Sequence, residues 1–440
     1  MQNYKEQFKG KKITVMGLGI LGRGLGYTKF LAECGADLIV TDLKPSTALR
    51  SSLNKLRTFK NPEGKRASYG ASIKFVLSKH RLEDFRGRDM VIKAAGVPLD
   101  SIYIEEAQKS NVPVEMDVSL FVKCAPEVMV IGVTGTRGKS MVTALIYEIL
   151  KQNEKFLNKK VYIGGNVRGV ATLPLLAKVR AGDILICELD SWQLQGFGDA
   201  KISPHISVFT SFMPDHMNYY KNDMKKYFND KANIFSYQNK EDVLIIRPDI
   251  KKLIHKNIKS KLIVVKPDNF QEENKECAIE VAKLFKIPNS KIKQAIKNFK
   301  GLEGRLQYVK TIRGVKIYND NNATTPEATM AGIEALKAKN IVLICGGADK
   351  GLNLENFEKT ISRCKAVVLI PGTGTEKLTS FKLKVESHKV KSLDNAIKIA
   401  LGLASRGDII LFSPAFASFG MFNNEYERND LFMKIIKKLK

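Results

Sequence analysis

A glycine-rich segment with the sequence GVTGTRGKS, Gly132 to Ser140, constrains the fold more than any other part of the chain. It follows an apolar run at 128–133 and precedes a helical pattern at 141–150. A strand, a glycine-rich turn and a helix in this order surround an anion with backbone N–H groups and a helix N-terminus. Lys139 adds a positive charge and Ser140 a hydroxyl for Mg²⁺, so the segment predicts an ATP site. A ligand-free glycine turn is the alternative, but it has no need for Lys-Ser at this spacing.

The segment departs from the strict phosphate-loop pattern. Val133 stands where the first glycine of the GxxxxGK[ST] pattern belongs, and Gly132 lies one position earlier. The candidate ATP-binding residues of this segment are Gly132, Thr134, Gly135, Thr136, Gly138, Lys139 and Ser140.

Length and composition indicate a globular protein of two to four domains, because 440 residues exceed one ordinary core. Hydrophobic residues make up 44% of the chain and charged residues 27%, and no uninterrupted apolar stretch approaches the roughly 20 residues that span a bilayer. The charged N-terminus leads directly into an expected strand, so we expect no signal peptide and a cytoplasmic location. The six cysteines form no CxxC pair, which favours reduced thiols over disulfides or a zinc site.

The net charge of +27 raises the possibility of a nucleic-acid partner. However, the lysines are spread over the whole length, without a basic stripe interleaved with aromatic residues. Solvated helical faces therefore explain the charge better, and we expect no nucleic-acid partner. An overall positive field would still attract small polyanionic substrates.

Short apolar runs, each followed by a turn and a helical pattern, predict mostly parallel sheets covered on both faces. The expected strands are 13–17, 38–41, 90–94, 112–114, 128–133, 184–189, 206–211, 243–246, 315–319, 341–345, 366–371 and 408–412. They group into an α/β protein of three domains: a Rossmann-like domain at 1–125, a P-loop ATPase-like domain at 126–300 and a Rossmann-like domain at 301–440. Ligands are expected at the carboxyl ends of the strands.

The first domain carries a GxGxxG motif, Gly17 to Gly22, directly after its first strand. The second strand ends at Asp42, near the position where a Rossmann acid holds a ribose. NAD, FAD, another nucleotide diphosphate and simple close packing are all compatible with this motif. A hydride-transfer enzyme has no need of an ATP loop, so we expect a nucleotide-diphosphate substrate here. Its candidate contacts are Gly17, Gly19, Ile20, Leu21, Gly22, Asp42 and Leu43.

Two residues of the second domain are candidate metal ligands beside Ser140. Glu188 ends a buried apolar strand, and His216 lies in a loop after the next strand. A carboxylate and an imidazole near a magnesium-binding serine suggest a two-metal site, although Mg²⁺ prefers oxygen ligands. A capping or core role for His216 remains equally open.

These segments resemble the ATP-dependent Mur ligase family of bacterial cell-wall synthesis, and the resemblance covers the whole chain. The Gly132–Ser140 segment is similar to the family's GxTGTxGK[ST] loop, which explains the shifted glycine. The stretches GGN at 164–166, ELDSWQL at 188–194 and DHM at 215–217 are also similar to family motifs. Lys231, within YFNDKA at 227–232, falls fifteen residues after His216, at the place of a family lysine. The resemblance implies that Glu188 binds Mg²⁺, that Lys231 is a carbamylated metal ligand, and that Asn166 and Asn274 contact the UDP-substrate and ATP.

The last domain most resembles family members that add D-glutamate. NDNNAT at 319–324, GGADK at 346–350 and SPAFASFGMF at 413–422 are similar to their NDSKAT, GGxxK and SPACASFDQF segments. Members that add L-alanine, a diamino acid or a dipeptide carry DYAH-type motifs in place of Asn319-Asp320. The resemblance implies that Arg305 and Asp320 meet ATP, and that D-glutamate is bound by Thr324, Lys350, Ser418 and Phe419.

Three departures from the family pattern affect these assignments. Asn322 stands where the family has a lysine, so a positive charge near the D-glutamate carboxylates is missing. Cys277 replaces the second asparagine of an N-x-x-N pair, which leaves Asn274. Ala94-Ala95-Gly96 replaces a Ser-Pro-Gly loop.

The implied reaction joins D-glutamate to UDP-N-acetylmuramoyl-L-alanine through an acyl phosphate, with ATP and two Mg²⁺ ions. Lys139, His216 and Lys231 are the expected catalytic residues, and a cytoplasmic monomer without membrane insertion is expected. Three alternatives remain: a folylpolyglutamate synthase-like ligase, a nucleic-acid-dependent motor ATPase, and a catalytically silent nucleotide sensor. The first-domain glycine loop and the 413–422 segment argue against the first of these.

Overall fold

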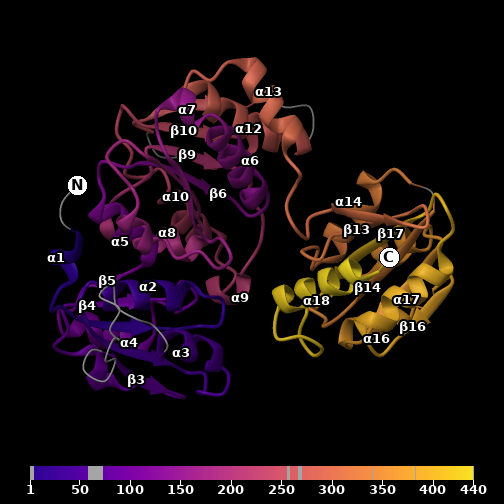
Figure 1. Ribbon diagram of the computed structural model, residues 1–440, viewed down its shortest axis with the longest axis horizontal. Coiled ribbons are helices and arrows are strands. Elements are labelled where there is room, and N and C mark those ends of the chain that lie inside the picture. Colours follow the sequence, from indigo (N-terminus) through magenta and orange to yellow (C-terminus); the bar gives the residue numbers. More distant parts are fainter. Residues whose placement is uncertain are drawn as a thin grey trace. The chain divides into compact units, whose positions relative to one another are not determined.

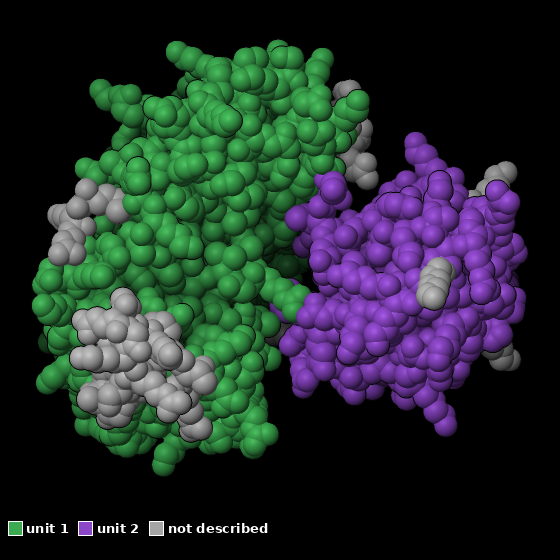
Figure 2. Space-filling model, in the orientation of Figure 1, with its two compact units in different colours: residues 1–299 green, residues 300–440 purple. Residues whose placement is uncertain are grey.

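A computed structural model describes residues 4–57, 73–254, 258–265, 270–338, 340–381 and 383–439. The chain divides into two compact units, residues 1–299 and 300–440 (Figure 2). The first unit contains two sheets and the second unit contains one, each flanked by helices (Figure 1). Each predicted domain therefore contains one sheet.

The first sheet has five parallel strands in the order β3-β2-β1-β4-β5. Its strands are β1 (Lys12–Met16), β2 (Asp37–Asp42), β3 (Ile73–Leu77), β4 (Met90–Lys93) and β5 (Val114–Glu115). Its helices are α1 (Tyr4–Phe8), α2 (Arg23–Glu33), α3 (Arg50–Arg57), η1 (Leu82–Phe85), α4 (Ile102–Lys109) and α5 (Asp117–Cys124). Four of the five residues of β1 are buried, as expected for a central strand covered on both faces.

The second sheet has six parallel strands in the order β11-β10-β9-β6-β8-β7. Its strands are β6 (Met129–Thr134), β7 (Val161–Gly165), β8 (Ile184–Glu188), β9 (Ile206–Phe209), β10 (Val243–Ile246) and β11 (Lys261–Val264). Its helices are α6 (Lys139–Gln152), α7 (Glu154–Leu157), η2 (Leu173–Ala177), α8 (Ser191–Ala200), α9 (Met217–Tyr220), α10 (Met224–Ala232), α11 (Pro248–Lys251), α12 (Phe270–Leu284) and α13 (Asn289–Asn298). Because β6 lies between β8 and β9, the turn after β6 has a neighbouring strand end on each side.

The first two sheets share one hydrophobic core, which explains why residues 1–299 form one unit. Leu18 and Phe121 belong to the same buried cluster as Leu185 and Phe209. A polar contact adds to this packing: the Asp117 carboxylate accepts from the backbone N–H groups of Thr172 (2.8 Å) and Leu173 (2.7 Å).

The third sheet forms the core of the second unit, with strands in the order β12-β13-β17-β14-β15-β16. Its strands are β12 (Gln307–Ile312), β13 (Val315–Asn319), β14 (Ile341–Gly346), β15 (Ala366–Ile370), β16 (Ser387–Lys389) and β17 (Ile409–Ala415). Its helices are α14 (Pro326–Ala335), α15 (Glu355–Ile361), α16 (Thr373–Thr379), α17 (Leu393–Leu403) and α18 (Glu425–Lys438). All pairings are parallel except β12 with β13.

The predicted α/β fold class is confirmed, and every strand expected from an apolar run is present within a few residues. The sequence analysis missed β3, β7, β11, β12 and β16. β12 and β13 form a hairpin whose turn, Arg313-Gly314, has positive φ angles of 50° and 80°. The sequence of β12, QYVKTI, mixes polar and apolar residues, whereas the buried parallel strands are continuous apolar runs. This strand therefore lacked the pattern on which the prediction was based. None of the described helices combines the length and apolar character needed to cross a membrane.

Candidate active site

The glycine-rich segment forms the turn between β6 and α6. Gly135 and Gly138 have positive φ angles of 147° and 88°, where other residues are strained. A Cβ atom at Gly135 would lie 2.1 Å from Thr210 Oγ1, and one at Gly138 would lie 2.6 Å from Asn274 Oδ1. The turn therefore needs glycine at both positions, and Asn274 of α12 borders it directly.

Gly132 lies inside β6, before the turn begins. A Cβ atom there would lie 2.5 Å from Pro204 Cγ and 3.0 Å from Leu189 Cδ1. Close packing thus explains why position 132 needs glycine. The sequence pattern alone did not provide this explanation.

We expect Gly132→Ala to lower the free energy of unfolding by about 1–3 kcal/mol, because overpacking a buried site displaces its neighbours. Thermal and urea denaturation would measure the change. Gly402→Ala is the matched control, because Gly402 of α17 has no atom within 4 Å of an added Cβ. Equal stability of the two variants would contradict the packing explanation.

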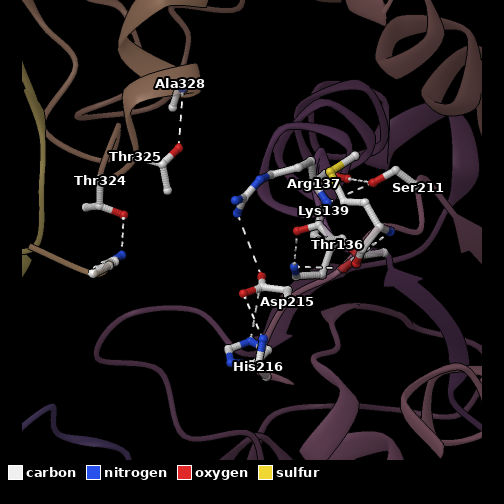
Figure 3. Close-up of polar contacts among 12 residues, drawn as sticks. Thr136, Arg137, Lys139, Ser211, Asp215, His216, Thr324, Thr325 and Ala328 are labelled. Carbon is white, nitrogen blue, oxygen red and sulfur yellow. Dashed lines mark hydrogen bonds and ion pairs between the residues drawn. The ribbon is translucent and has the colours of Figure 1, made fainter. Parts of the chain in front are cut away.

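The two residues that follow β9, Thr210 and Ser211, hydrogen-bond to the glycine-rich turn (Figure 3). Arg137 N donates to Ser211 Oγ (2.8 Å), and Ser211 Oγ donates to Arg137 O (2.9 Å). Thr136 N donates to Ser211 O (2.8 Å), and Thr210 Oγ1 donates to Arg137 O (2.5 Å). Sequence reasoning missed Thr210 and Ser211, although two hydroxyl residues after a buried strand were a signal for them.

Two lysine side chains meet at one backbone carbonyl of the turn. Lys139 Nζ donates to Gly135 O (2.9 Å) and Thr136 O (3.2 Å), and Lys231 Nζ donates to Gly135 O (3.0 Å). Lys231 comes from α10 and is only 2% exposed. Its burial, with the nearby Lys139 charge as a second cause, lowers the pKa of Lys231 to about 7. Both amino groups therefore lie where a nucleotide's phosphates are predicted, and the Lys139 charge disfavours a second charge on Lys231.

Glu188 is the last residue of β8 and is 7% exposed. Its backbone pairs with Val133 of β6 on one side and Gly165 of β7 on the other. Asn166 N donates to Glu188 O (2.7 Å). Asn166, a predicted contact of the UDP-substrate, therefore lies next to Glu188, a predicted metal ligand. Ser140 is the second residue of α6, at the helix end that follows the turn.

His216 lies just before the short helix α9 with a positive φ of 56°. Its ring packs against the Trp192 ring, with centroids 4.6 Å apart, and its Nε2 lies 3.8 Å from Asp215 Oδ2. Asp215 Oδ2 also lies 3.8 Å from Arg137 Nη1, which connects the His216 loop to the glycine-rich turn (Figure 3). Burial lowers the pKa of His216, which favours the neutral imidazole. Sequence reasoning missed the Arg137–Asp215 pair.

In the first sheet, the glycine loop after β1 and the end of β2 meet through Asp42. Gly19 N donates to Asp42 Oδ2 and Lys44 N donates to Asp42 Oδ1, both at 2.9 Å. Gly17, Gly19 and Gly22 all have positive φ angles. Ile20 is 44% exposed and Leu43 65% exposed, so both offer apolar surface to solvent. Leu21 lies in the same loop and is partly buried.

In the second unit, hydrogen bonds connect three loops at the carboxyl ends of β13, β14 and β17. Ala415 N donates to Ala323 O (2.9 Å), and Ala348 and Ala417 exchange two backbone hydrogen bonds. Lys350 Nζ donates to Thr324 Oγ1 (3.2 Å). Next to Thr324, the Thr325 side chain caps α14 by accepting from Ala328 N (Figure 3). The predicted D-glutamate residues Thr324, Lys350, Ser418 and Phe419 all belong to these loops; Ser418 is buried and Phe419 is 61% exposed.

Asp320 is buried at the start of the first of these loops. Its carboxylate accepts from Leu306 N (3.0 Å) and Ser413 Oγ (2.8 Å). Burial raises the pKa of Asp320 to about 6. Arg305, predicted to meet the ATP phosphates, is exposed and precedes Leu306.

Two of the three departures from the family pattern, Asn322 and Cys277, contact other parts of the protein. Asn322 Nδ2 donates to Glu303 O (3.3 Å), and Asn322 N donates to Gly304 O (2.9 Å). Cys277 is 1% exposed in the core of the second sheet. The Cys277 thiol is therefore part of the packing around α12.

Comparison with known proteins identifies the family of this chain. Residues 133–304 match the model of the Mur ligase middle domain, and residues 304–416 match that of the Mur ligase, glutamate ligase domain. The UDP-N-acetylmuramoylalanine–D-glutamate ligase of Borreliella afzelii is 34% identical, with 99% of both chains covered. The chain belongs to the Mur ligase family. The corresponding enzyme of Roseiflexus sp. is 33% identical, with 98% of this chain and 99% of the relative covered.

The fold is also that of solved Mur ligases. The crystal structure of UDP-N-acetylmuramate–alanine ligase MurC from Thermotoga maritima has a TM-score of 0.60 at 17% identity, with 97% of this chain and 99% of that chain covered. In the present Mur ligase, the predicted site residues fall into a set in the first unit and a set in the second. Among the described residues, no group of three His, Cys, Asp or Glu side chains gathers as a metal site.

Proposed function

We propose that this Mur ligase adds D-glutamate to UDP-N-acetylmuramoyl-L-alanine at the expense of ATP. The observation that carries the proposal is the full-length match, at 33–34% identity, to enzymes named for this reaction. The glycine-rich turn, with Lys139 and Lys231 both bonded to Gly135 O, supports the ATP part of the reaction.

The reaction proceeds in two steps. An oxygen of the alanyl carboxylate attacks the γ-phosphorus of ATP, and ADP leaves with the electrons of the broken bond. The amine of D-glutamate then attacks the acyl carbon, phosphate leaves, and the nitrogen loses a proton. Both steps bring anions together, so the protein contributes mainly positioning and positive charge.

In the first step, Lys139 and the backbone N–H groups at the start of α6 neutralise the β- and γ-phosphates. In the structure, Lys139 Nζ already lies at the turn, 2.9 Å from Gly135 O. Asn274 and the remaining residues of the turn (Gly132, Thr134, Gly135, Thr136, Gly138) shape the nucleotide site. Arg305 and Asp320, which belong to the second unit, stay predicted ATP contacts.

The donor set fits magnesium once Lys231 is modified. Glu188 and Ser140 offer oxygen ligands, which Mg²⁺ prefers, whereas the Lys231 ammonium would repel the ion. Two Mg²⁺ ions held by Ser140, Glu188, His216 and carbamylated Lys231 would screen the repulsion between the carboxylate and the γ-phosphate. His216 also orients the reacting oxygens.

Carbamylation joins the neutral Lys231 amine to CO₂, forming an N–C bond and releasing one proton. The buried position of Lys231 and its cationic neighbour both disfavour the ammonium form and so supply the neutral amine. The product is an oxygen anion, which the adjacent Lys139 charge stabilises.

The other substrates are assigned to the remaining loops. The glycine loop of the first sheet, with Asp42, Leu43 and Asn166, holds the UDP-substrate. Thr324, Lys350, Ser418 and Phe419 hold D-glutamate. We propose that the enzyme acts in the cytoplasm as a monomer, which light scattering of the purified protein would measure.

An assay with purified protein tests this function. ADP release is followed with ATP, Mg²⁺, UDP-N-acetylmuramoyl-L-alanine and each of a panel of amino acids that includes D- and L-glutamate, L-alanine and a diamino acid. Of the amino acids in the panel, we expect only D-glutamate to give turnover. Turnover with another amino acid but none with D-glutamate would overturn the substrate assignment.

A further inference from the structure

A fully buried arginine lies behind the loops that we assign to D-glutamate. Arg428 of α18 is 0% exposed, although it carries a charge. Among the described residues it forms no ion pair with a carboxylate, and burial lowers its pKa to about 10. It therefore stays charged at neutral pH. Burying an unpaired charge is costly, so its contacts require an explanation.

The guanidinium of Arg428 donates three hydrogen bonds, which reach two of these loops. Its Nε donates to Asn321 Oδ1 (2.8 Å) and its Nη2 to Asn321 O (3.0 Å). Its Nη1 donates to Phe416 O (3.2 Å). Asn321 follows β13, and Phe416 is the first residue after β17. One side chain thus crosslinks the ends of two neighbouring strands.

The crosslinked residues lie close in sequence to the proposed amino-acid contacts. Thr324 follows Asn321 in the first loop, and Ser418 follows Phe416 in the second. A backbone bond from Ala415 N to Ala323 O (2.9 Å) ties the same loops between these points. A planar guanidinium can donate to both loops at once, whereas a lysine ammonium offers a single centre.

We propose that Arg428 is a positioning residue for the incoming amino acid, which holds the loops of Thr324 and Ser418 in one fixed arrangement. The inference rests on the proposed function, because it takes those two residues as the amino-acid contacts. Arg428 is fully buried and its guanidinium hydrogen-bonds to the loops, so its role is to hold the residues that contact the substrate.

Steady-state kinetics of Arg428→Met and Arg428→Lys test this role. We expect the KM for D-glutamate to rise about tenfold or more in Arg428→Met, since small misplacements of binding groups carry large kinetic costs. The KM values for ATP and for the UDP-substrate should stay within about twofold, because these contacts lie on other loops. Arg428→Lys, which keeps the charge, should recover part of the affinity for D-glutamate.

Ile436→Ala is the matched control, because Ile436 is buried on the same helix in the core of the third sheet. It should lower the thermal midpoint while leaving the KM for D-glutamate unchanged. The proposal is overturned if Arg428→Met changes all three KM values alike, or changes the KM for D-glutamate no more than Ile436→Ala does. If Arg428→Met does not fold, the three KM values of Arg428→Lys are compared with those of Ile436→Ala instead.

Failure of the proposed function would give a different result. In that case the unaltered enzyme would not use D-glutamate at all. The positioning role would then be measured with whichever amino acid the enzyme accepts, and the same selective rise in KM would be required.

Discussion

Replacing Lys139 by alanine is expected to reduce D-glutamate-dependent ADP release at least about 10²-fold, since removing one preorganised donor from a charged transition state costs that much. The Lys139 ammonium lies at the centre of the glycine-rich turn and is the positive charge nearest to the start of α6 in sequence. Steady-state rates at saturating ATP would measure the loss.

Lys151→Ala is the matched control for this variant. Lys151 lies at the other end of α6, where it pairs with Glu154 (2.8 Å). We expect near-normal activity from it, and binding of an ATP analogue by calorimetry would show whether the Lys139 variant has lost nucleotide affinity. Ligation by Lys139→Ala at a rate close to that of the unaltered enzyme would contradict the assignment of the turn.

Replacing Lys231 by alanine is expected to cause a comparable loss of activity, and short carboxylic acids such as acetate or propionate should restore part of it. The reason is that truncation of a 2% exposed side chain leaves a buried space beside Gly135 O, where a small carboxylate can replace the carbamate. Lys226→Ala is the control, because Lys226 is exposed on the same helix beside Asp223. The rates are measured with and without the added acid.

A spectroscopic measurement separates carbamylation from a role of the plain ammonium. The unaltered enzyme equilibrated with ¹³C-labelled CO₂ should show a carbamate carbon signal by NMR, and Lys231→Ala should lack it. Unchanged activity of Lys231→Ala would remove Lys231 from the site. If Lys231→Ala is inactive and the unaltered enzyme shows no carbamate signal, Lys231 is not carbamylated and acts as a cation instead.

Local sequence patterns predicted those parts of the site that depend on neighbouring residues. The turn from Gly132 to Ser140 and the glycine loop after β1 were both predicted from spacing, since strand, turn and helix are continuous in sequence. Asp42 was also predicted, because the end of a parallel strand is where a ligand site is expected. In the structure its carboxylate accepts from Gly19 N, so it also shapes the glycine loop.

Contacts between distant segments could not be predicted in this way. Ser211 holds Arg137, and Arg428 holds Asn321 and Phe416, yet no spacing rule connects these positions. Lys231 would have passed for a solvated helix residue without the family resemblance, because its burial depends on how α10 packs against α8 and on the hydrogen bond to Gly135 O. The packing of Gly132 against Pro204 likewise appears only when β6 and the segment before β9 are placed side by side.

The account's central claim is that ATP cleavage is coupled to formation of one amide bond to D-glutamate. The most direct test measures ADP, phosphate and the nucleotide product by chromatography and mass spectrometry in the same reaction. We expect equal amounts of all three when ATP, UDP-N-acetylmuramoyl-L-alanine and D-glutamate are present together, and no amide product when any one of them is left out. ADP release without a D-glutamate adduct on the UDP-substrate would contradict the claim.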